Sequence, residues 1–260
     1  MILLGIFSFN FFSKARKIYP NIILISIDAL RFDHLGCYGY KRPTSPNIDK
    51  LAQQGILFTQ VIAQASITGG SIPSLLSSTY PSTNGHYIFV EDPAVLTVST
   101  LPLILNKYGY VTAAISAHGE IFNSIPGLDR GFDLISDTKD TPANMITKRA
   151  LKWLHENKNN TFFIWVHYFD THAPYQPPAP YDKLFITDEF NLSEISGFRR
   201  EFAKTGIISL NTRKNMGKKE VDYGISQYDG ALRFVDDQIG VMLGDLKSSG
   251  LLKNSVVIIK

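Results

Sequence analysis

Runs of aliphatic residues that end abruptly at polar ones recur along the chain. Residues 21–27 (NIILISI) are almost entirely apolar and stop at Asp28, and residues 161–168 (TFFIWVHY) repeat the pattern before a polar segment. Shorter runs occupy residues 111–115 and 255–259. A continuous apolar run of this length is typical of a strand that is covered on both faces of a parallel sheet. The four segments therefore predict buried parallel strands, the first of which delivers a carboxylate at its carboxyl end.

Between these runs, apolar positions recur at steps of three and four, which predicts helices. The predicted helices are one opened by Ser45-Pro46 and closed by Gly55, two short ones over 70–78 and 99–107, an amphipathic one over 145–157, and a long core-facing one over 221–246. Strands that alternate with helices predict a three-layer α/β/α sandwich with a mostly parallel central sheet. Residues 177–219 have mixed polarity and no clean period, so we expect an excursion from the sheet there.

The composition indicates a globular protein and gives no sign of a particular binding partner. The 260 residues are 44% hydrophobic and 19% charged, which predicts one globular domain, placed here at residues 20–260. The 26 basic and 23 acidic residues are spread evenly along the chain, so a nucleic-acid partner is not expected. A single cysteine, Cys37, excludes an internal disulfide and a CxxC-type zinc site.

The first 19 residues are predicted to form an N-terminal arm. Residues 1–12 are apolar, but the positive charges of Lys14, Arg16 and Lys17 follow the apolar run, which reverses the order of a secretory signal. The run also falls short of the roughly 20 apolar residues that span a bilayer. Membrane association is therefore not expected from this chain, and the compartment, cytoplasmic or cell-envelope, is left open.

Candidate chemistry gathers where the predicted strands end. Ligands of open parallel sheets bind beyond the carboxyl ends of strands, which singles out Asp28 and residues 168–175. A carboxylate in that place either binds a ligand or caps the following helix. Thr68 belongs to a glycine turn (TGGS) before a predicted helix, where N–H groups converge on an anion and a hydroxyl can attack it. An ordinary capped turn has the same composition.

Two histidines follow the second strong strand. His167 and His172 could bind a metal, contact an anion or donate a proton. A buried histidine such as His167 is more often only hydrogen-bonded within the core. His172 lies further beyond the strand and is therefore the better functional candidate.

The order of these segments resembles the sulfatase family of the alkaline phosphatase superfamily. Residues 20–31 (PNIILISIDALR), 34–39 (HLGCYG) and 44–49 (TSPNID) are similar to the opening of that family. Further blocks resemble its nucleophile helix (74–81), its next strand and loop (109–113 and 130–133), its histidine loop (167–175) and the long helix before its second metal motif (228–240). The resemblance implies the N-terminal portion of an alkaline-phosphatase-like catalytic domain, with the Asp-His pair of that second motif falling after Lys260.

Position by position, the resemblance implies three functional residues. Asp28 matches a metal ligand, Thr68 stands where the family places its nucleophile and would also bind the metal, and His172 matches the histidine that contacts the transferred group. Thr68 replaces the cysteine that formylglycine sulfatases modify, and Ile72 replaces the arginine of the same motif. The resemblance therefore implies a variant in which the threonine hydroxyl itself attacks.

Two further departures affect the ligands. Ala29 takes the place of the family's second acidic ligand, which leaves Asp28 as one carboxylate at the first metal position. The family's basic Gly-Lys-Trp-His stretch falls near residues 116–119, where the lysine position is occupied by Ala117 and His118 is its neighbour. The residues that would bind the substrate anion thus differ from those of the family.

The expectation that follows is a metal-dependent hydrolase of sulfate or phosphate esters that acts through a covalent threonine intermediate. Its cofactor would be a divalent cation (calcium, magnesium, manganese or zinc), and its substrate a small-molecule, glycan or lipid ester. Two alternatives stay open: a phosphoethanolamine- or phosphoglycerol-type transferase, and a truncated, non-catalytic remnant that binds anions.

Overall fold

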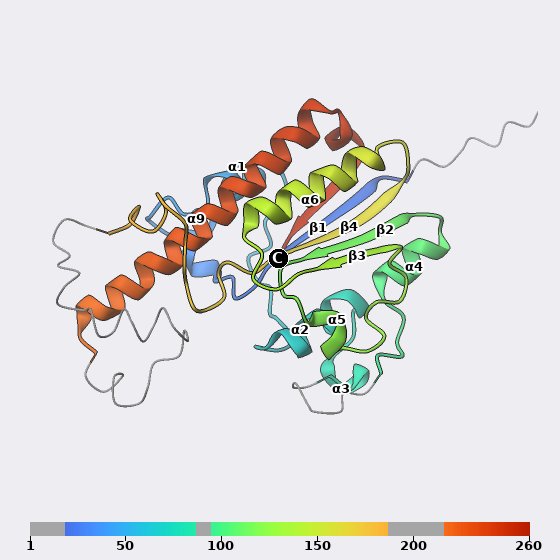
Figure 1. Ribbon diagram of the computed structural model, residues 1–260, viewed down its shortest axis with the longest axis horizontal. Coiled ribbons are helices and arrows are strands. Elements are labelled where there is room, and N and C mark those ends of the chain that lie inside the picture. Colours follow the sequence, from blue (N-terminus) through green and yellow to red (C-terminus); the bar gives the residue numbers. More distant parts are fainter. Residues whose placement is uncertain (1–18, 87–94, 187–215) are drawn as a thin grey trace, which may run out of the picture.

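A computed structural model describes residues 19–86, 95–186 and 216–260 of the chain (Figure 1). The predicted arm at residues 1–19 falls almost wholly outside the described residues. Most of the predicted excursion over 177–219 does so as well. The assignment of residues 20–260 to one domain stays a prediction.

The centre of the fold is a five-stranded sheet in the order β3-β2-β4-β1-β5. Its strands are β1 (Asn21–Ile27), β2 (Val111–Ser116), β3 (Leu134–Asp137), β4 (Phe162–Tyr168) and β5 (Ser255–Ile259). Every pairing between them is parallel. Four strands confirm the sequence prediction within a residue or two, whereas the edge strand β3 was not predicted.

Helices cover both faces of the sheet, as Figure 1 shows. On one face lie the long α9 (Lys218–Ser248) and α6 (Ala143–Glu156). On the other lie α2 (Thr68–Ser77), α4 (Leu101–Lys107) and α5 (Ile121–Ser124). The predicted three-layer α/β/α sandwich is confirmed.

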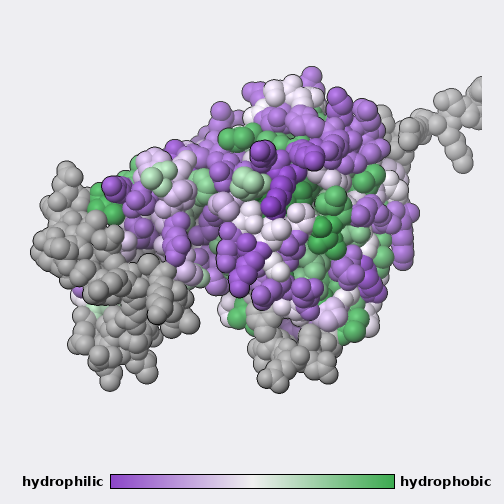
Figure 2. Space-filling model, viewed as in Figure 1, coloured by the Kyte–Doolittle hydropathy of each residue, from purple (hydrophilic) through white to green (hydrophobic). Residues whose placement is uncertain are grey.

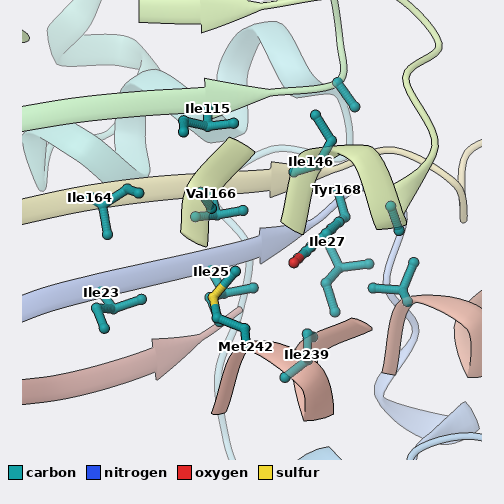
Figure 3. Close-up of a cluster of buried hydrophobic side chains, with 14 of the residues drawn as sticks. Ile23, Ile25, Ile27, Ile115, Ile146, Ile164, Val166, Tyr168, Ile239 and Met242 are labelled. Atoms are coloured by element: carbon teal, nitrogen blue, oxygen red, sulfur yellow. The ribbon is translucent and has the colours of Figure 1, made fainter. Parts of the chain in front are cut away.

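The alternation of side chains along each strand divides the core into two clusters. In β1, Ile23, Ile25 and Ile27 pack against α6 and α9, where they meet Ile239 and Met242 (Figure 3). Leu24 points to the opposite face, toward α2 and α5. The strands are therefore apolar on both sides, which is why their sequences lack a polar–apolar alternation.

Shorter elements complete the described chain. α1 (Pro46–Gln54) packs on α9, and α3 (Pro81–Asn84) follows α2. Three single-turn 3₁₀ helices span Phe32–His34, Gly36–Tyr38 and Leu251–Asn254. Gly240 of α9 allows the close approach of α1, because a Cβ atom there would lie 2.6 Å from the side chain of Asn47.

The surface in the view of Figure 2 is mostly hydrophilic over α6 and α9, and hydrophobic side chains gather toward the β3 side of the sheet. Leu134 and Ile135 of β3 are among the exposed large hydrophobic residues. Among the described helices, none combines the length and the apolar character needed to span a membrane.

Candidate functional site

Asp28 is the first residue beyond β1, at the carboxyl edge of the sheet. Its backbone N–H donates to the carbonyl of Tyr168 at the end of β4, so the two central strands stay paired up to this point. The chain then turns sharply, because Ala29 has a left-handed backbone with φ of 52°. The Tyr228 hydroxyl on α9 holds this turn by donating to the carbonyl of Ala29 and accepting from the N–H of Arg31. The turn thereby fixes the position of the carboxylate.

Thr68 is the first residue of α2, and its side chain meets Asp28. The Thr68 Oγ1 donates a hydrogen bond of 3.0 Å to Oδ2 of Asp28, across 40 residues of sequence. The first turn of an α-helix has N–H groups without intrahelical partners and carries the positive end of the helix dipole. The hydroxyl thus lies beside a carboxylate and at a helix end that favours anions.

His167 lies under the same carboxylate, from the adjacent strand β4. Its side chain is only 2% exposed, and its Nε2 is 3.5 Å from Oδ2 of Asp28. This separation is longer than a standard hydrogen bond, so we describe it as a close electrostatic contact. The other ring nitrogen, Nδ1, is 2.8 Å from the hydroxyl of Ser26 on β1.

The ring of Phe169 connects three histidines. Its centroid lies 4.4 Å from that of His172 in a stacked arrangement, 5.1 Å from His118 and 6.5 Å from His167. His172 is exposed, and its Nδ1 donates to the carbonyl of Ala173 at 2.6 Å. That bond leaves Nε2 as the atom of His172 that can exchange a proton or contact an anion.

Burial and neighbouring groups shift the pKa values of two side chains in the site. Burial raises the pKa of Asp28, but the close contact with His167, the hydrogen bond from Thr68 and the charge of His172 together lower it by more, so the net pKa is below the ordinary value. Burial, followed by the charge of His167, lowers the pKa of His118. Near neutral pH, Asp28 is therefore ionised and His118 is neutral.

The structure places the predicted residues close to one another. Asp28 and Thr68 share a hydrogen bond, and His172 is near enough to Asp28 for its charge to affect the pKa of that carboxylate. Ile72 is buried in the core between α2 and the sheet, so it does not supply a charge in place of the family's arginine. Ala117 is fully buried in the opposite cluster.

Cys37 lies elsewhere, in the second 3₁₀ turn. Burial, followed by the charge of Asp49, raises the pKa of its thiol to about 11. The protonated, poorly nucleophilic thiol agrees with the absence of a predicted role for it.

Sequence reasoning did not single out every residue that gathers here. His118 was only a neighbour of a substituted position, and neither Ser26 nor Phe169 was singled out. His167 was interpreted as a hydrogen-bonded core residue, and the structure agrees, because it is buried and lies 2.8 Å from the Ser26 hydroxyl. Its contact with Asp28 was not foreseen. A usable signal was present, because Ser26, His167 and Ser116 occupy matching positions near the ends of three apolar strands. Three polar residues at paired positions in a buried sheet indicate a polar patch.

The side chains around Asp28 supply some of the ligands that a divalent cation needs. Within the three described ranges, no group of three or more histidine, cysteine or carboxylate side chains is arranged to hold a metal ion. Asp28 and Thr68 supply a carboxylate and a hydroxyl, the oxygen ligands that calcium, magnesium and manganese prefer. Two buried imidazole nitrogens nearby, Nε2 of His167 and Nδ1 of His118, have no hydrogen-bond partner in the described chain. These residues fit part of a metal and anion site.

Comparison with known proteins identifies the family. The family model described as Sulfatase matches residues 20–259, and the chain belongs to this family. It is 26% identical to human iduronate 2-sulfatase over a 296-residue alignment that covers 91% of this chain and 53% of that protein. It is 38% identical to human arylsulfatase A over 103 residues, which is 36% of this chain and 19% of that protein. The chain thus spans about half the length of iduronate 2-sulfatase.

Solved structures show the same fold at lower identity. Phosphonate monoester hydrolase of Agrobacterium radiobacter superposes with a TM-score of 0.69 and 19% identity, covering 92% of this chain and 62% of that one. An alkaline phosphatase superfamily protein from Vibrio parahaemolyticus gives a TM-score of 0.62 and 18% identity over 93% of this chain and 53% of that one. The α/β architecture of this chain is therefore the fold of these solved structures.

Proposed function

We propose that this chain forms part of the catalytic domain of a metal-dependent hydrolase of sulfate or phosphate esters, with Thr68 as its nucleophile. The observation that carries the proposal is the 3.0 Å hydrogen bond from Thr68 Oγ1 to Asp28 Oδ2. It joins the first residue of α2 to the carboxyl end of a central strand, where ligands of such sheets bind.

A divalent cation held by Asp28 and Thr68 would stabilise the alkoxide form of the threonine, which is a weak nucleophile as a neutral alcohol. Only Oδ2 of Asp28 takes part in the contacts described, so Oδ1 is open to a ligand. In the family, further ligands follow the strand that corresponds to β5. The carbonyl of Lys260 accepts from the N–H of Ile27, so residues that follow Lys260 in this register would lie beside the end of β1 and Asp28.

The residues of the chain perform the other parts of the proposed reaction. Oγ1 of Thr68 bonds to the sulfur or phosphorus as the bond from that atom to the ester oxygen breaks, and the hydroxyl proton leaves along the hydrogen bond to Asp28. The departing oxygen takes a proton from Nε2 of His172 in its doubly protonated form, which leaves a lone pair on that atom. Water then gives a proton to this Nε2 as it attacks the threonine ester. Sulfate or phosphate is released, and the proton held by Asp28 returns to Oγ1 and regenerates Thr68. The N–H groups at the start of α2 stabilise the oxyanion throughout.

Two features bear on the substrate class. The names of the matched relatives, iduronate 2-sulfatase and arylsulfatase A, favour sulfate esters. The threonine at the nucleophile position resembles instead the members of the superfamily that act on phosphate esters or transfer phosphoethanolamine. We propose hydrolysis as the main reaction. Transfer to an acceptor alcohol would use the same threonine intermediate.

Matched variants of the full-length protein test the nucleophile. Thr68→Ala removes the hydroxyl and should lower kcat on aryl sulfate and aryl phosphate esters by about a thousandfold or more, whereas Thr68→Ser keeps the hydroxyl and should stay within about tenfold of the wild type. Ser71→Ala, in the same turn of α2, is the control and should leave turnover unchanged. Equal turnover in Thr68→Ala and the wild type would exclude Thr68 as the nucleophile. Absence of turnover in all four proteins would favour the non-catalytic alternative.

A further inference from the structure

A buried hydrogen-bond chain runs behind Asp28. On β4, Trp165 and His167 point to the α2 face of the sheet, and Ser26 of β1 lies directly beside His167 in the parallel register. The Trp165 Nε1–H donates to the Ser26 hydroxyl at 2.8 Å, and the same hydroxyl is 2.8 Å from His167 Nδ1. Ser26 is 4% exposed and His167 is 1% exposed, so water does not replace these partners.

The donors and acceptors of this chain determine where the histidine proton lies. An indole N–H can only donate, so the Ser26 oxygen accepts from Trp165. The Ser26 hydroxyl proton then needs an acceptor, and Nδ1 of His167 is the one that the described residues offer. A proton on Nδ1 would leave the buried hydroxyl without an acceptor, which is unfavourable. The neutral imidazole of His167 therefore carries its proton on Nε2.

That proton faces the site. Nε2 of His167 is 3.5 Å from Oδ2 of Asp28 and has no other partner among the described residues. A lone pair in this place would oppose the carboxylate, whereas an N–H dipole attracts it, and the attraction is strong because both groups are buried. The same Oδ2 accepts the hydroxyl of Thr68. Both donors thus hold one oxygen of Asp28.

We propose that His167 is a positioning residue: the Trp165–Ser26 chain locks its proton on Nε2, and this N–H holds the Asp28 carboxylate in the orientation that meets Thr68 and presents Oδ1 to the cation. The positioning part rests on the proposed function, because it assumes a cation at Asp28. The location of the proton does not.

The assignment distinguishes His167 from His172. The Nδ1–H of His172 donates to the carbonyl of Ala173, so its neutral ring has a free lone pair on Nε2. The two imidazoles thus present opposite tautomers near Asp28. His172 can accept a proton from a reacting group, and His167 cannot do so without breaking its hydrogen bond to Ser26. His167 therefore orients the carboxylate and does not act as a general base.

The proton position is measured on the wild-type protein, and a variant is needed only to assign the signals. Nitrogen-15 NMR of histidine-labelled full-length protein at neutral pH distinguishes the two neutral tautomers and the doubly protonated ring. The signals of His167 are assigned by their loss in a His167→Gln sample. We expect a protonated Nε2 and an unprotonated Nδ1. Any state in which Nδ1 carries a proton would overturn the proposal.

Calcium binding to the full-length protein, measured by titration calorimetry, tests the positioning role. His167→Leu removes the N–H and should weaken calcium binding by about 10–100-fold, the usual cost of losing a partner behind a metal ligand. His167→Gln keeps an N–H donor at a similar reach and should recover most of the affinity. His155→Gln, at an exposed histidine paired with Asp245, is the control and should bind as the wild type does.

The outcomes separate this inference from the proposed function. If the wild type binds calcium and folded His167→Leu binds it equally well, the positioning role is wrong and the proposed function stands. If His167→Leu fails to fold, a Ser26→Ala variant decides, because it frees the tautomer and should weaken calcium binding. A wild type that binds neither calcium nor manganese would contradict the metal part of the proposed function. The tautomer measurement would still decide where the His167 proton lies.

Discussion

At the scale of single residues, two carboxylates beyond the ends of adjacent strands have opposite properties. Burial raises the pKa of Asp28, but His167, Thr68 and His172 lower it to a net value below the ordinary one. Burial also raises the pKa of Asp170, to about 6, because only the backbone N–H groups of Ala143 and Asp170 oppose it and Oδ2 is buried without a partner. Neighbouring donors therefore decide which carboxylate stays charged.

Asp170 gives a prediction about stability and pH. Its folded pKa lies above its unfolded value, so the folded state binds the proton more tightly, and the free energy of unfolding falls as pH rises from about 4 to about 6. Asp170→Asn cannot ionise and still accepts from Ala143 N–H, so at pH of about 7 it should be more stable than the wild type by about 1–3 kcal/mol. Urea unfolding at several pH values measures this.

The control for Asp170 is Asp129→Asn, at an exposed carboxylate. It should keep the pH dependence of the wild type. If the free energy of unfolding depends on pH in the same way in Asp170→Asn and the wild type, ionisation of Asp170 does not destabilise the folded state and the prediction is wrong.

Residue-level prediction from sequence was possible where position alone was informative. Asp28 was proposed because it ends an apolar run, and Thr68 because it opens a glycine turn within a family pattern; the structure brings the two side chains together, and their roles stay predictions. The role proposed for His167 was not predicted, because a histidine in an apolar strand is more often a hydrogen-bonded core residue. What distinguishes it is Ser26, a partner 141 residues away in sequence, and that pairing exists only once β1 and β4 lie side by side.

At the scale of elements, α1 depends on α9 for its N-terminal cap. Ser45, the N-cap residue of α1, makes no side-chain cap hydrogen bond. Asp236 of α9 instead accepts from the N–H of Asn47 at 3.0 Å, the N–H of Ile48 at 2.8 Å and the side-chain amide of Asn47 at 2.9 Å. One buried carboxylate thus satisfies donors at the start of a helix 188 residues earlier.

Asp236→Ala should therefore destabilise the fold strongly. It leaves three donors at the α1–α9 contact without their acceptor, and we expect a loss of about 2–4 kcal/mol in the free energy of unfolding. Chemical denaturation of the variant measures this loss. Lys247→Ala, at an exposed position of the same helix, should change stability by less than about 0.5 kcal/mol. Similar losses in both variants would refute the capping role.

Element prediction failed in two informative places. β3 was missed because its four residues are exposed or half-buried and contain no apolar run, so only its pairing with β2 makes it a strand. The helix predicted from residue 70 begins at Thr68, because Ile67 is its N-cap. That shift places the hydroxyl on the first helical residue, beside Asp28. The start of the helix could not be predicted from the sequence, because the glycines at positions 69 and 70 are weak helix formers.

At the scale of the whole molecule, the β5 edge of the sheet carries exposed apolar side chains. Val256 is 46% exposed and Ile258 is 44% exposed, although their strand pairs with β1 on its other side. An apolar edge strand with unpaired backbone groups is a site for pairing between chains.

We therefore predict that the chain of residues 1–260, when isolated, self-associates through β5. Val256→Lys places a charge on the exposed side of this strand and should shift the protein toward the monomer in sedimentation-velocity experiments. Val241→Lys, at a 53% exposed position on α9, introduces the same charge elsewhere and should have no such effect. Equal shifts in both variants would indicate a general effect of charge. A monomeric wild type would contradict the prediction.

The three-layer architecture was predictable because long apolar strands alternating with amphipathic helices allow few arrangements. The order of the strands in the sheet was not predictable, because no local feature of the sequence indicates that β1 lies between β4 and β5. The site follows from that order. The carboxyl ends of β1, β4 and β2 bring Asp28, His167 and His118 to one edge, and α2 delivers Thr68 there.

The central claim is that the Thr68 hydroxyl forms an ester with the transferred group. The most direct measurement is peptide mass spectrometry of the full-length protein, acid-quenched during turnover of an aryl sulfate or aryl phosphate. The account predicts a peptide that carries one sulfuryl or phosphoryl group on Thr68, present in the wild type and absent in Thr68→Ala. Steady turnover with the modified group on another residue, or with no modified peptide under conditions that trap such esters, would contradict it.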